Sequence, residues 1–382
     1  MAVRAGFGTA PITPPTPCRL AGFAEVQDAT EVHDDLTARA LFLASSSPPG
    51  VVCLVVCDLM GMSPEFAGPA RVAVAAELGL EPAAVLVAST HTHSAPSTMA
   101  GTDRLGWPVP EGFGAVVTSG CVAAARQARD GAADAALRFG RWSLPGGLSV
   151  NRRGYPYDPW FSVLDVVAPD GAPIGTLANL SIHPVALGPE CLAVSADWAH
   201  PFREALSART GGAAMLLSGA LGDVNPVHVH RQGNDCGRDG FEEAAELGEE
   251  LASAVAAVLG TAESLPGGGV RVIAERRLEV PIGGTDLARG RRSDTMPVEL
   301  VEWGIGPVRV VSVPGEGFQE LGRRVLASRG DRVLLAGLAP VWQGYFPVPY
   351  ADGYEERVSY GPRAVAAVLD ALLEVPSPSL SR

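Results

Sequence analysis

The sequence predicts an α/β fold made of mixed β-sheets flanked by helices. Short apolar runs typical of strands alternate along the chain with longer segments that carry apolar residues at helical spacing. Two of the short runs, Ser162–Asp165 and Ile174–Ile182, flank the turn sequence Pro169-Asp-Gly-Ala-Pro173 and so predict an antiparallel hairpin. Glycine and proline number 45 and 32 among 382 residues, which is below the roughly 25–30% typical of a low-complexity chain. We therefore expect a globular chain whose sheet is not wholly parallel.

The predicted strands share runs of apolar, often β-branched residues bounded by turn residues. They are Leu36–Leu43, Val51–Cys57, Ala84–Ala88, Ala136–Trp142, Ser162–Val167, Ile174–Ile182, Ala214–Leu217, Val270–Val280, Val308–Val313 and Val333–Leu338. The predicted helices share apolar residues spaced three and four apart. They are Pro64–Leu78, Phe113–Arg129, Pro201–Ala208, Phe241–Leu259, Glu316–Ala327 and Pro362–Leu373.

Three stretches have the composition of linkers: Ser45–Gly50, Leu265–Gly269 and the tail from Val375 onward. At roughly 150 residues per domain, the length fits either one large unit or two compact ones. Residues with chemical potential lie on both sides of Leu265–Gly269 and would have to converge. We therefore expect one catalytic unit over residues 1–382.

The charge of the chain excludes several classes of function. The 29 basic side chains are all arginines and face 42 acidic ones, so the net charge is −13 and repels nucleic acid. Without lysine the chain cannot form a Schiff base with pyridoxal phosphate or carry a Walker motif.

Neither the apolar runs nor the N-terminus suggests a membrane protein. The apolar runs fall far short of the ~18 residues that a membrane span requires, and the N-terminal residues contain no signal-peptide pattern. We therefore expect a cytoplasmic chain. The six cysteines are scattered without a Cys-x-x-Cys pair, which favours buried thiols.

The sharpest motif is Ser89-Thr-His-Thr-His-Ser-Ala-Pro96, directly after a predicted strand. Histidines at positions i and i+2 of an extended segment point to the same side. His91 and His93 could therefore bind a divalent metal, usually zinc, or one could bind the metal and the other the substrate. A polar strand end with hydrogen-bonded histidines fits the motif equally well.

Two better-known His-x-His enzyme classes fit poorly. Metallo-β-lactamase-like hydrolases place Asp-His after the pair, whereas Ser94-Ala-Pro96 follows here. TIM-barrel amidohydrolases often use a carbamylated lysine, and this chain contains no lysine.

Further polar residues follow other predicted strands. His183 precedes a proline that ends its strand, and Asp197 and the glycine-rich segment Ser218–Pro226 lie downstream. Polar loops, or residues that line an active site, would both have this pattern.

Eight motifs in the same order make the chain similar to the neutral or alkaline non-lysosomal ceramidases, over their N-terminal catalytic domain. The motifs are Gly6-Phe-Gly-Thr-Ala-Pro-Ile-Thr-Pro-Pro15, Ala21-Gly-Phe23, Leu36-Thr-Ala-Arg-Ala40, Ser89–Pro96, Asn151-Arg-Arg153, Ile182-His-Pro184, Gly219–Pro226 and Pro314-Gly-Glu316. They span nearly the whole chain. The resemblance implies the catalytic-domain fold of that family without its C-terminal immunoglobulin-like domain.

The resemblance also implies a zinc site and its surroundings. The implied zinc ligands are His91, His183, Glu316 and Tyr345, the last across a gap in the alignment. His93 would lie beside the metal, Arg152 would bind the substrate amide or the oxyanion, Gly22 would line the pocket, and Tyr354 would face the substrate.

The chemistry of these residues is consistent with the implied site. Two imidazoles and one carboxylate form a common catalytic zinc triad, which leaves room for a water whose pKa the metal lowers towards ~7. By itself, Glu316 at a predicted strand-to-helix junction would equally fit a residue that stabilises the first helical turn.

The sequence departs from the family at two places. Asn225 stands where the ceramidases carry a serine, and an amide can donate a hydrogen bond but cannot act as that nucleophile. The segment Val227–Cys236 replaces a long cysteine-bearing loop, and His228, His230 and Cys236 in it could form a second metal site or a polar surface loop. Because the sequence shows no secretion signal and the immunoglobulin-like domain of the family is not expected, extracellular ceramide itself is a doubtful substrate.

Together these features predict a zinc-dependent hydrolase of a carbon–nitrogen amide bond. The substrate would be a small soluble or amphiphilic acyl-amide, attacked by metal-bound water. Two alternatives stay open: an acyl-transfer or cyclisation enzyme of a biosynthetic pathway, and a metal-binding protein without turnover. The sequence leaves open whether the chain forms a homo-oligomer.

Overall fold

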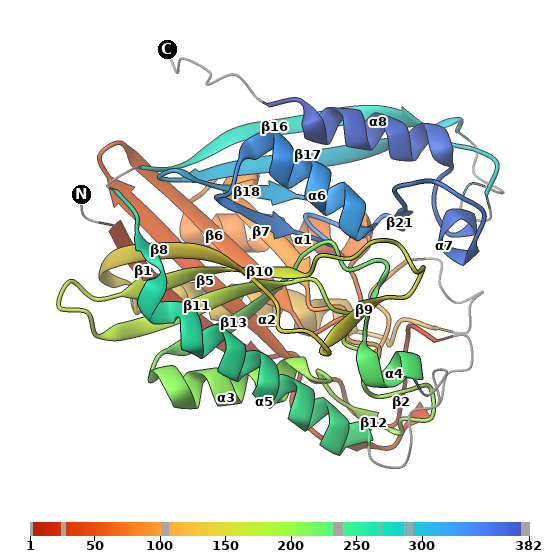
Figure 1. The fold of residues 1–382 in the computed structure, drawn as a ribbon, viewed down its shortest axis with the longest axis horizontal. Helices are drawn as coiled ribbons and strands as arrows, with labels where there is room; N and C mark the ends of the chain where they lie inside the picture. Colours follow the sequence, from red (N-terminus) through yellow and green to blue (C-terminus); the bar gives the residue numbers. More distant parts are fainter. Residues whose placement is uncertain are drawn as a thin grey trace.

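The computed structural model describes residues 3–23, 28–100, 107–231, 240–266, 269–285, 288 and 293–375, with only the backbone of 230 and 231. Within these residues, two large sheets lie face to face and helices cover both outer faces (Figure 1). This arrangement confirms the predicted α/β class with mixed sheets flanked by helices.

The larger sheet has nine strands, in the order β13-β11-β10-β8-β1-β5-β6-β7, with β15 paired to β8. Its strands are β1 (Val3–Pro11), β5 (Thr37–Ser46), β6 (Pro49–Cys57), β7 (Val85–Ser89), β8 (Ala133–Ser143), β10 (Trp160–Val167), β11 (Pro173–Leu180), β13 (Ala213–Ser218) and β15 (Glu263–Ser264). The predicted hairpin is confirmed, because β10 and β11 pair antiparallel around the turn. Parallel pairing of β6 with β7 and of β11 with β13 makes the sheet mixed.

The second sheet has the order β16-β17-β18-β20. Its strands are β16 (Val270–Pro281), β17 (Thr295–Ile305), β18 (Val308–Ser312) and β20 (Val333–Ala336). Short two-stranded ladders are β2 (Cys18–Arg19) with β3 (Asp28–Ala29), β4 (Glu31–Val32) with β12 (Ala193–Val194), β9 (Ser149–Asn151) with β14 (Val224–Pro226), and β19 (Glu316–Gly317) with β21 (Tyr345–Phe346).

The helices lie on the outer faces of the two sheets (Figure 1). They are α1 (Pro64–Leu78), α2 (Phe113–Asp130), α3 (Ala199–Thr210), α4 (Val227–Arg231), α5 (Gly240–Val258), α6 (Gln319–Arg329), α7 (Tyr354–Arg357) and α8 (Pro362–Leu373), with 3₁₀ turns η1 (Pro82–Ala84) and η3 (Leu259–Thr261). Helices α1, α2, α3 and α5 pack on the larger sheet, and α6 and α8 pack on the smaller one.

The side-chain pattern of the strands explains the layers. In β5, Ala40 and Phe42 face α1 and α2, whereas Leu41 and Leu43 face the second sheet. Strand β6 is likewise buried on both faces, by helices on one side and by the second sheet on the other, and this explains its uninterrupted apolar run. Leu54, which precedes the predicted linker Leu265–Gly269, and Trp303, which follows it, belong to one apolar cluster between the sheets.

Strand β1 is missing from the sequence prediction because its composition is poor for a strand. Its glycines lie directly under α2: a Cβ on Gly6 would come within 2.1 Å of the carbonyl oxygen of Ala128, and one on Gly8 within 2.1 Å of that of Ala124. Glycine is thus required there for close helix–strand approach, at the cost of β-propensity. Strand β17 was missed as well, since Pro297 and its acidic residues obscure the alternation.

Several other predictions need correction. Helix α6 begins at Gln319, so the predicted helix Glu316–Ala327 was wrong at its start and Glu316 lies in β19 instead. The segment Ser45–Gly50 is the tight turn between β5 and β6 and not a linker. Strand β11 ends at Leu180, three residues before His183.

The coiling of the larger sheet brings its edge strands β7 and β13 towards each other. The Ser218 hydroxyl at the end of β13 donates to the carbonyl of Thr90, which follows β7, at 2.8 Å. Arg39 of β5 likewise donates to the carbonyl of Ala214 at 3.1 Å. Right-handed twist accumulated over the strands accounts for this approach. The polar residues that follow β7, β11 and β13 therefore gather in one region.

The cysteine prediction is confirmed for the described thiols. Cys18, Cys53, Cys57 and Cys121 are buried and free, and Cys191 is half-buried. Cys236 lies outside the described residues. Within the described part of the chain, no helix combines the length and apolarity that a membrane crossing needs.

A buried ion pair joins α3 to the end of β6. Both terminal guanidinium nitrogens of Arg203 donate to Asp58, at 2.6 and 2.9 Å, and both side chains are at most 2% exposed. We expect Arg203→Met to lower the free energy of unfolding by roughly 3 kcal/mol, because it leaves the Asp58 carboxylate buried without its main partner. Urea unfolding measures this.

The matched control is Arg209→Met on the same helix. Arg209 pairs with Glu249 at the surface, where both side chains are about a third to a half exposed. Its loss should cost no more than about 1 kcal/mol. Equal losses for the two variants would contradict the role assigned to the buried pair.

Candidate metal centre

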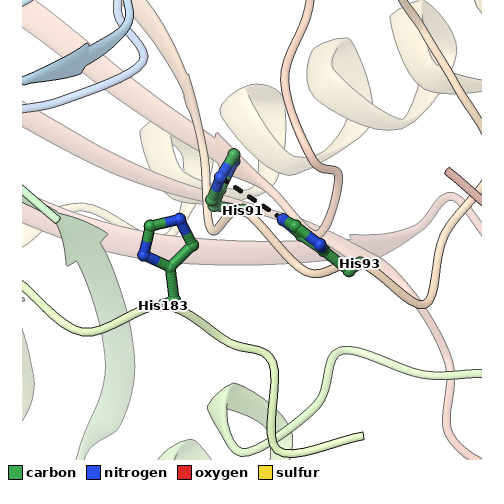
Figure 2. Close-up of side chains that lie close together, drawn as sticks. All are labelled: His91, His93 and His183. Carbon is green, nitrogen blue, oxygen red and sulfur yellow. Dashed lines mark hydrogen bonds between the residues drawn. The ribbon is translucent and has the colours of Figure 1, made fainter. Parts of the chain in front are cut away.

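Three imidazoles from two distant stretches of the chain meet in one place (Figure 2). The ring centroid of His91 lies 5.0 Å from that of His93 and 4.9 Å from that of His183. One ring nitrogen of each histidine lies within 4.8 Å of the others. The predicted convergence of these histidines is thus present in the structure.

The two histidines of the His-x-His motif converge for a different reason than predicted. Strand β7 ends at Ser89, and His91 has a φ of 81°, so the segment is not extended. Its backbone N–H donates to the carbonyl of Leu59 at 2.9 Å. A left-handed residue held by this hydrogen bond, and not strand alternation, directs both rings inward.

Backbone carbonyls orient the imidazoles of His91 and His183. The Nδ1 atom of His91 lies 2.5 Å from the carbonyl oxygen of Met60, and that of His183 lies 3.0 Å from that of Val224. A carbonyl only accepts, so both Nδ1 atoms carry the proton and each Nε2 is an acceptor; that of His91 lies 3.5 Å from Nε2 of His93 (Figure 2). Burial lowers the pKa of His183 and of His93, which favours the neutral form that binds metals.

Glu316 completes the cluster from the far end of the chain. Its Oε2 lies 3.1 Å from Nε2 of His91 and 3.5 Å from Nε2 of His183, and its side chain is 2% exposed. Burial would raise the pKa of Glu316, but a proton on either neighbouring imidazole would hold it well below its usual range. Within the described residues, Oε2 has no hydrogen-bond partner. A buried anionic oxygen between two imidazole lone pairs fits a bound cation.

Tyr345 lies beside Glu316 because β19 and β21 pair in parallel register at these two residues. Burial and the Glu316 charge raise the pKa of Tyr345 well above its usual range. The ring of Tyr354 meets that of Tyr345 edge-on, with centroids 6.2 Å apart. Both tyrosines therefore belong to the region of the cluster.

Arg152 approaches the same region from the end of β9. It forms an ion pair with the buried Glu355 and donates to the carbonyl of Gly222 at 2.7 Å. Burial would lower the pKa of Arg152, but the neighbouring carboxylates of Glu355 and Glu316 raise it. The guanidinium thus remains charged, and its position is fixed by Glu355.

Gly22 supports the ring of His93. Its φ is +118°, and a Cβ placed there would lie 2.4 Å from Cγ of His93. The ring of Phe23 packs edge-on against the same imidazole, with centroids 4.9 Å apart. Gly22 is therefore in van der Waals contact with His93, whereas the sequence had indicated only that it lines a pocket.

Two aspartates fix the loops around the cluster. Asp197 accepts backbone N–H groups of Ala186 and Leu187, which follow His183, although burial raises its pKa to about 7. Asp223 accepts from the side chain of Asn151 at 2.6 Å and from the backbone N–H of Gln319 at 2.8 Å. Asp223 therefore ties the Arg152 segment to the start of α6.

Asn225 lies in β14, one residue after the carbonyl that orients His183. It pairs with Val150 of β9 and is partly exposed. Its position agrees with a residue near the cluster.

The segment after Asn225 was predicted to hold either a second metal site or a polar loop. His228 lies on α4, and its Nε2 is 3.5 Å from a carboxylate oxygen of Glu243. The side chain of His230 and all of Cys236 lie outside the described residues. Among the described side chains, the candidate group of metal-ligating residues is the one around His91, His93 and His183, and His228 is not part of it.

Sequence reasoning missed Trp342 and Glu355. The indole Nε1 of Trp342 donates to Oε1 of Glu316 at 2.8 Å. The paired glutamates of Tyr354-Glu-Glu-Arg357, next to an implied substrate residue and in a chain rich in arginine, were a usable signal for Glu355. No sequence signal pointed to Trp342.

The sequence and the fold of the chain were compared with those of known proteins. No protein-family model matches the chain, and no curated protein does. The crystal structure of neutral ceramidase from Pseudomonas aeruginosa matches with a TM-score of 0.84 at 18% identity, over 98% of this chain and 74% of that one. The chain has the neutral ceramidase fold. A structure described as ceramidase complexed with C2 matches with a TM-score of 0.79 at 17% identity, over the same fractions.

The ceramidase fold agrees with the resemblance read from the eight sequence motifs. At 17–18% identity the likeness establishes the architecture of the chain. The neutral ceramidase fold thus confirms the predicted fold class, while the roles of individual residues remain predictions.

The contact between Gly22 and His93 leads to a stability prediction. Gly22→Ala should lower the free energy of unfolding by about 1–3 kcal/mol more than Gly283→Ala, because the new methyl group overlaps the imidazole. Gly283 is the control: its φ of +155° is also unfavourable for alanine, and a Cβ added there would meet no atom within 4 Å. Urea unfolding of both variants measures the difference, and equal losses would contradict the contact.

The burial of His93 leads to a pH prediction for the metal-free protein. Its folded-state pKa is well below the ordinary ~6.5, so the stability it contributes is present above pH ~6.5 and is lost as pH falls below that value. We therefore expect the unfolding free energy of the wild type minus that of His93→Gln to fall by up to ~1.4 kcal/mol per pH unit below 6.5.

Asp197, whose raised pKa gives the opposite pH dependence of stability, is present in both proteins. Its contribution therefore cancels when the unfolding free energy of His93→Gln is subtracted from that of the wild type. Urea unfolding at pH 7.5, 6.5 and 5.5 in the presence of a chelator provides the measurement. A difference that does not change with pH would show that His93 titrates normally.

Proposed function

We propose that the chain is a zinc-dependent hydrolase of the carbon–nitrogen bond of an acyl-amide. The single observation that carries this proposal is the buried Oε2 of Glu316, 3.1 and 3.5 Å from the Nε2 atoms of His91 and His183. Such a donor set is typical of catalytic zinc sites. The ceramidase fold supports an amide bond as the target.

His91, His183, Glu316 and Tyr345 would hold the ion. Both imidazoles present an unprotonated Nε2, and Tyr345 lies beside Glu316 through the β19–β21 register. When bound, zinc supplies a Lewis acid that polarises a carbonyl group and lowers the pKa of a water molecule. The negative charge of Glu316 and the neutral imidazoles suit a divalent cation.

The other residues of the site act on the substrate. Arg152 keeps its positive charge and is held by Glu355, so it can stabilise an anionic carbonyl oxygen. Burial keeps the ring of His93 neutral, and its Nε2 lies 3.5 Å from Nε2 of His91, so it would serve as a polar contact beside the metal. Asn225 would donate a hydrogen bond to the substrate, and Gly22 and Tyr354 would border the place where the substrate lies.

The substrate class is a small acyl-amide that is soluble or amphiphilic. With asparagine at position 225, the side chain there cannot act as a nucleophile, so the reaction depends on activated water. Acyl transfer to an amine is the second candidate, because position 225 departs from the family in this respect. Incubation with amine acceptors distinguishes the two by the product formed.

The first functional prediction concerns metal dependence. Protein loaded with zinc should hydrolyse members of a panel of fluorogenic N-acyl amides, lose this activity on dialysis against a chelator, and regain it with zinc. His91→Ala should lose both bound zinc and activity. His33→Ala is the matched control, because His33 stacks on Phe241 outside the cluster. Hydrolysis that is indifferent to chelation would exclude the proposed mechanism.

The second functional prediction concerns Asn225. Asn225→Ala should retain zinc and lower turnover by ~10²–10³, the usual cost of losing one donor to an oxyanion. Asn225→Ser should stay active. If Asn225→Ala were as inactive as His91→Ala while still holding zinc, Asn225 would have a larger role than hydrogen bonding.

A further inference from the structure

The indole of Trp342 contacts the carboxylate of Glu316 on the side away from the histidines. Its Nε1 donates to Oε1 at 2.8 Å, while Oε2 faces the Nε2 atoms of His91 and His183. The two oxygens of Glu316 therefore have different surroundings. One is occupied by a hydrogen-bond donor, and the other has no hydrogen-bond partner in the described part of the chain.

The position of Trp342 is itself fixed by the segment that follows β6. The backbone N–H of Trp342 donates to the carbonyl of Met62 at 2.7 Å. Gly61 lies against its side chain so closely that a Cβ there would be 2.9 Å from Cβ and Cγ of Trp342. The indole also packs on an apolar cluster formed by Ala21, Met60, Met99 and Trp107. An indole held on several sides is a fixed donor.

The same short segment orients His91. The carbonyl of Leu59 accepts the backbone N–H of His91, and the carbonyl of Met60 contacts its Nδ1. Residues 59–62 therefore hold His91 directly and hold Glu316 through Trp342. Two side chains that lie 225 positions apart in the sequence thus share one backbone support.

We propose that Trp342 is a positioning residue that fixes the plane of the Glu316 carboxylate, so that one oxygen stays directed at the imidazoles. Without the indole N–H, this plane could turn about the last bond of the side chain, and neither oxygen would be held in the direction of the metal. Hydrogen-bonding partners of metal ligands typically change metal affinity by 10–100-fold when removed. This inference rests on the proposed metal site, because it concerns the geometry of one of that site's ligands.

Trp342→Phe is the direct test, because it removes the donor and keeps a planar aromatic ring. Zn²⁺ affinity is measured by competition with a chromophoric chelator. We expect a 10–100-fold loss relative to the wild type. Trp303→Phe is the matched control: Trp303 is also a buried indole donor, bonded to the carbonyl of Ala83, but lies between the two sheets away from the histidines. Its affinity for zinc should stay within about threefold of the wild type.

A second measurement does not depend on metal. In protein labelled with ¹⁵N-tryptophan, the indole N–H signal that disappears in Trp342→Phe belongs to Trp342. Glu316→Ala should shift this signal towards the position of a free indole, while the Trp303 signal stays in place. An unchanged Trp342 signal would overturn the proposed contact.

The outcomes separate this inference from the proposed function. If the wild type binds no zinc, the metal site itself is wrong. If the wild type binds zinc and Trp342→Phe binds it within about threefold as tightly, Trp342 does not position Glu316. Equal losses in Trp342→Phe and Trp303→Phe would mean that lost stability, and not ligand orientation, lowers the affinity.

Discussion

The structure around the candidate metal centre depends on one constraint: a carboxylate is buried between two neutral imidazoles. An isolated charge in such a place is costly, so the surrounding chain must hold compensating groups at fixed distances. Backbone carbonyls fix the tautomers of His91 and His183, and an indole takes the outer oxygen of Glu316. These contacts come from three places: Met60 in the loop after β6, Val224 in β14, and Trp342 in the loop before β21.

The fold brings these loops together by coiling its larger sheet and packing the second sheet against it. The loop after β7 carries His91 and His93, the loop after β11 carries His183, and the β19–β21 ladder next to the second sheet carries Glu316 and Tyr345. Polar ties such as Ser218 to Thr90, and Asp223 to the start of α6, hold these loops at fixed separations. The cluster is therefore a product of tertiary packing, although each ligand has a recognisable local context.

The sequence predicted the class of fold because alternation and turn chemistry act locally. It predicted that His91 and His183 meet only through the resemblance to the ceramidases. It gave the wrong reason for the arrangement of His91 and His93, because no sequence pattern indicates a positive φ at a histidine. Glu316 was expected in a helix because the apolar spacing of α6 extends backwards past its true start. Strand β1 was missed because close packing under α2 selects glycine against strand propensity. The contact between Trp342 and Glu316 is long-range, and no local pattern encodes it.

The order of the site residues along the chain has a consequence for biosynthesis. His91 lies in the first quarter of the chain, whereas Glu316 and Tyr345 lie in its last fifth. A nascent chain that has emerged past residue 183 but not yet to residue 316 has all three histidines and lacks the carboxylate and the phenol. Since the strands next to Glu316 pack on strands made much earlier, the centre closes only through long-range contacts, which are slow to form. A complete site therefore requires nearly the whole chain, and a translation product that ends before residue 316 carries the imidazoles without the carboxylate.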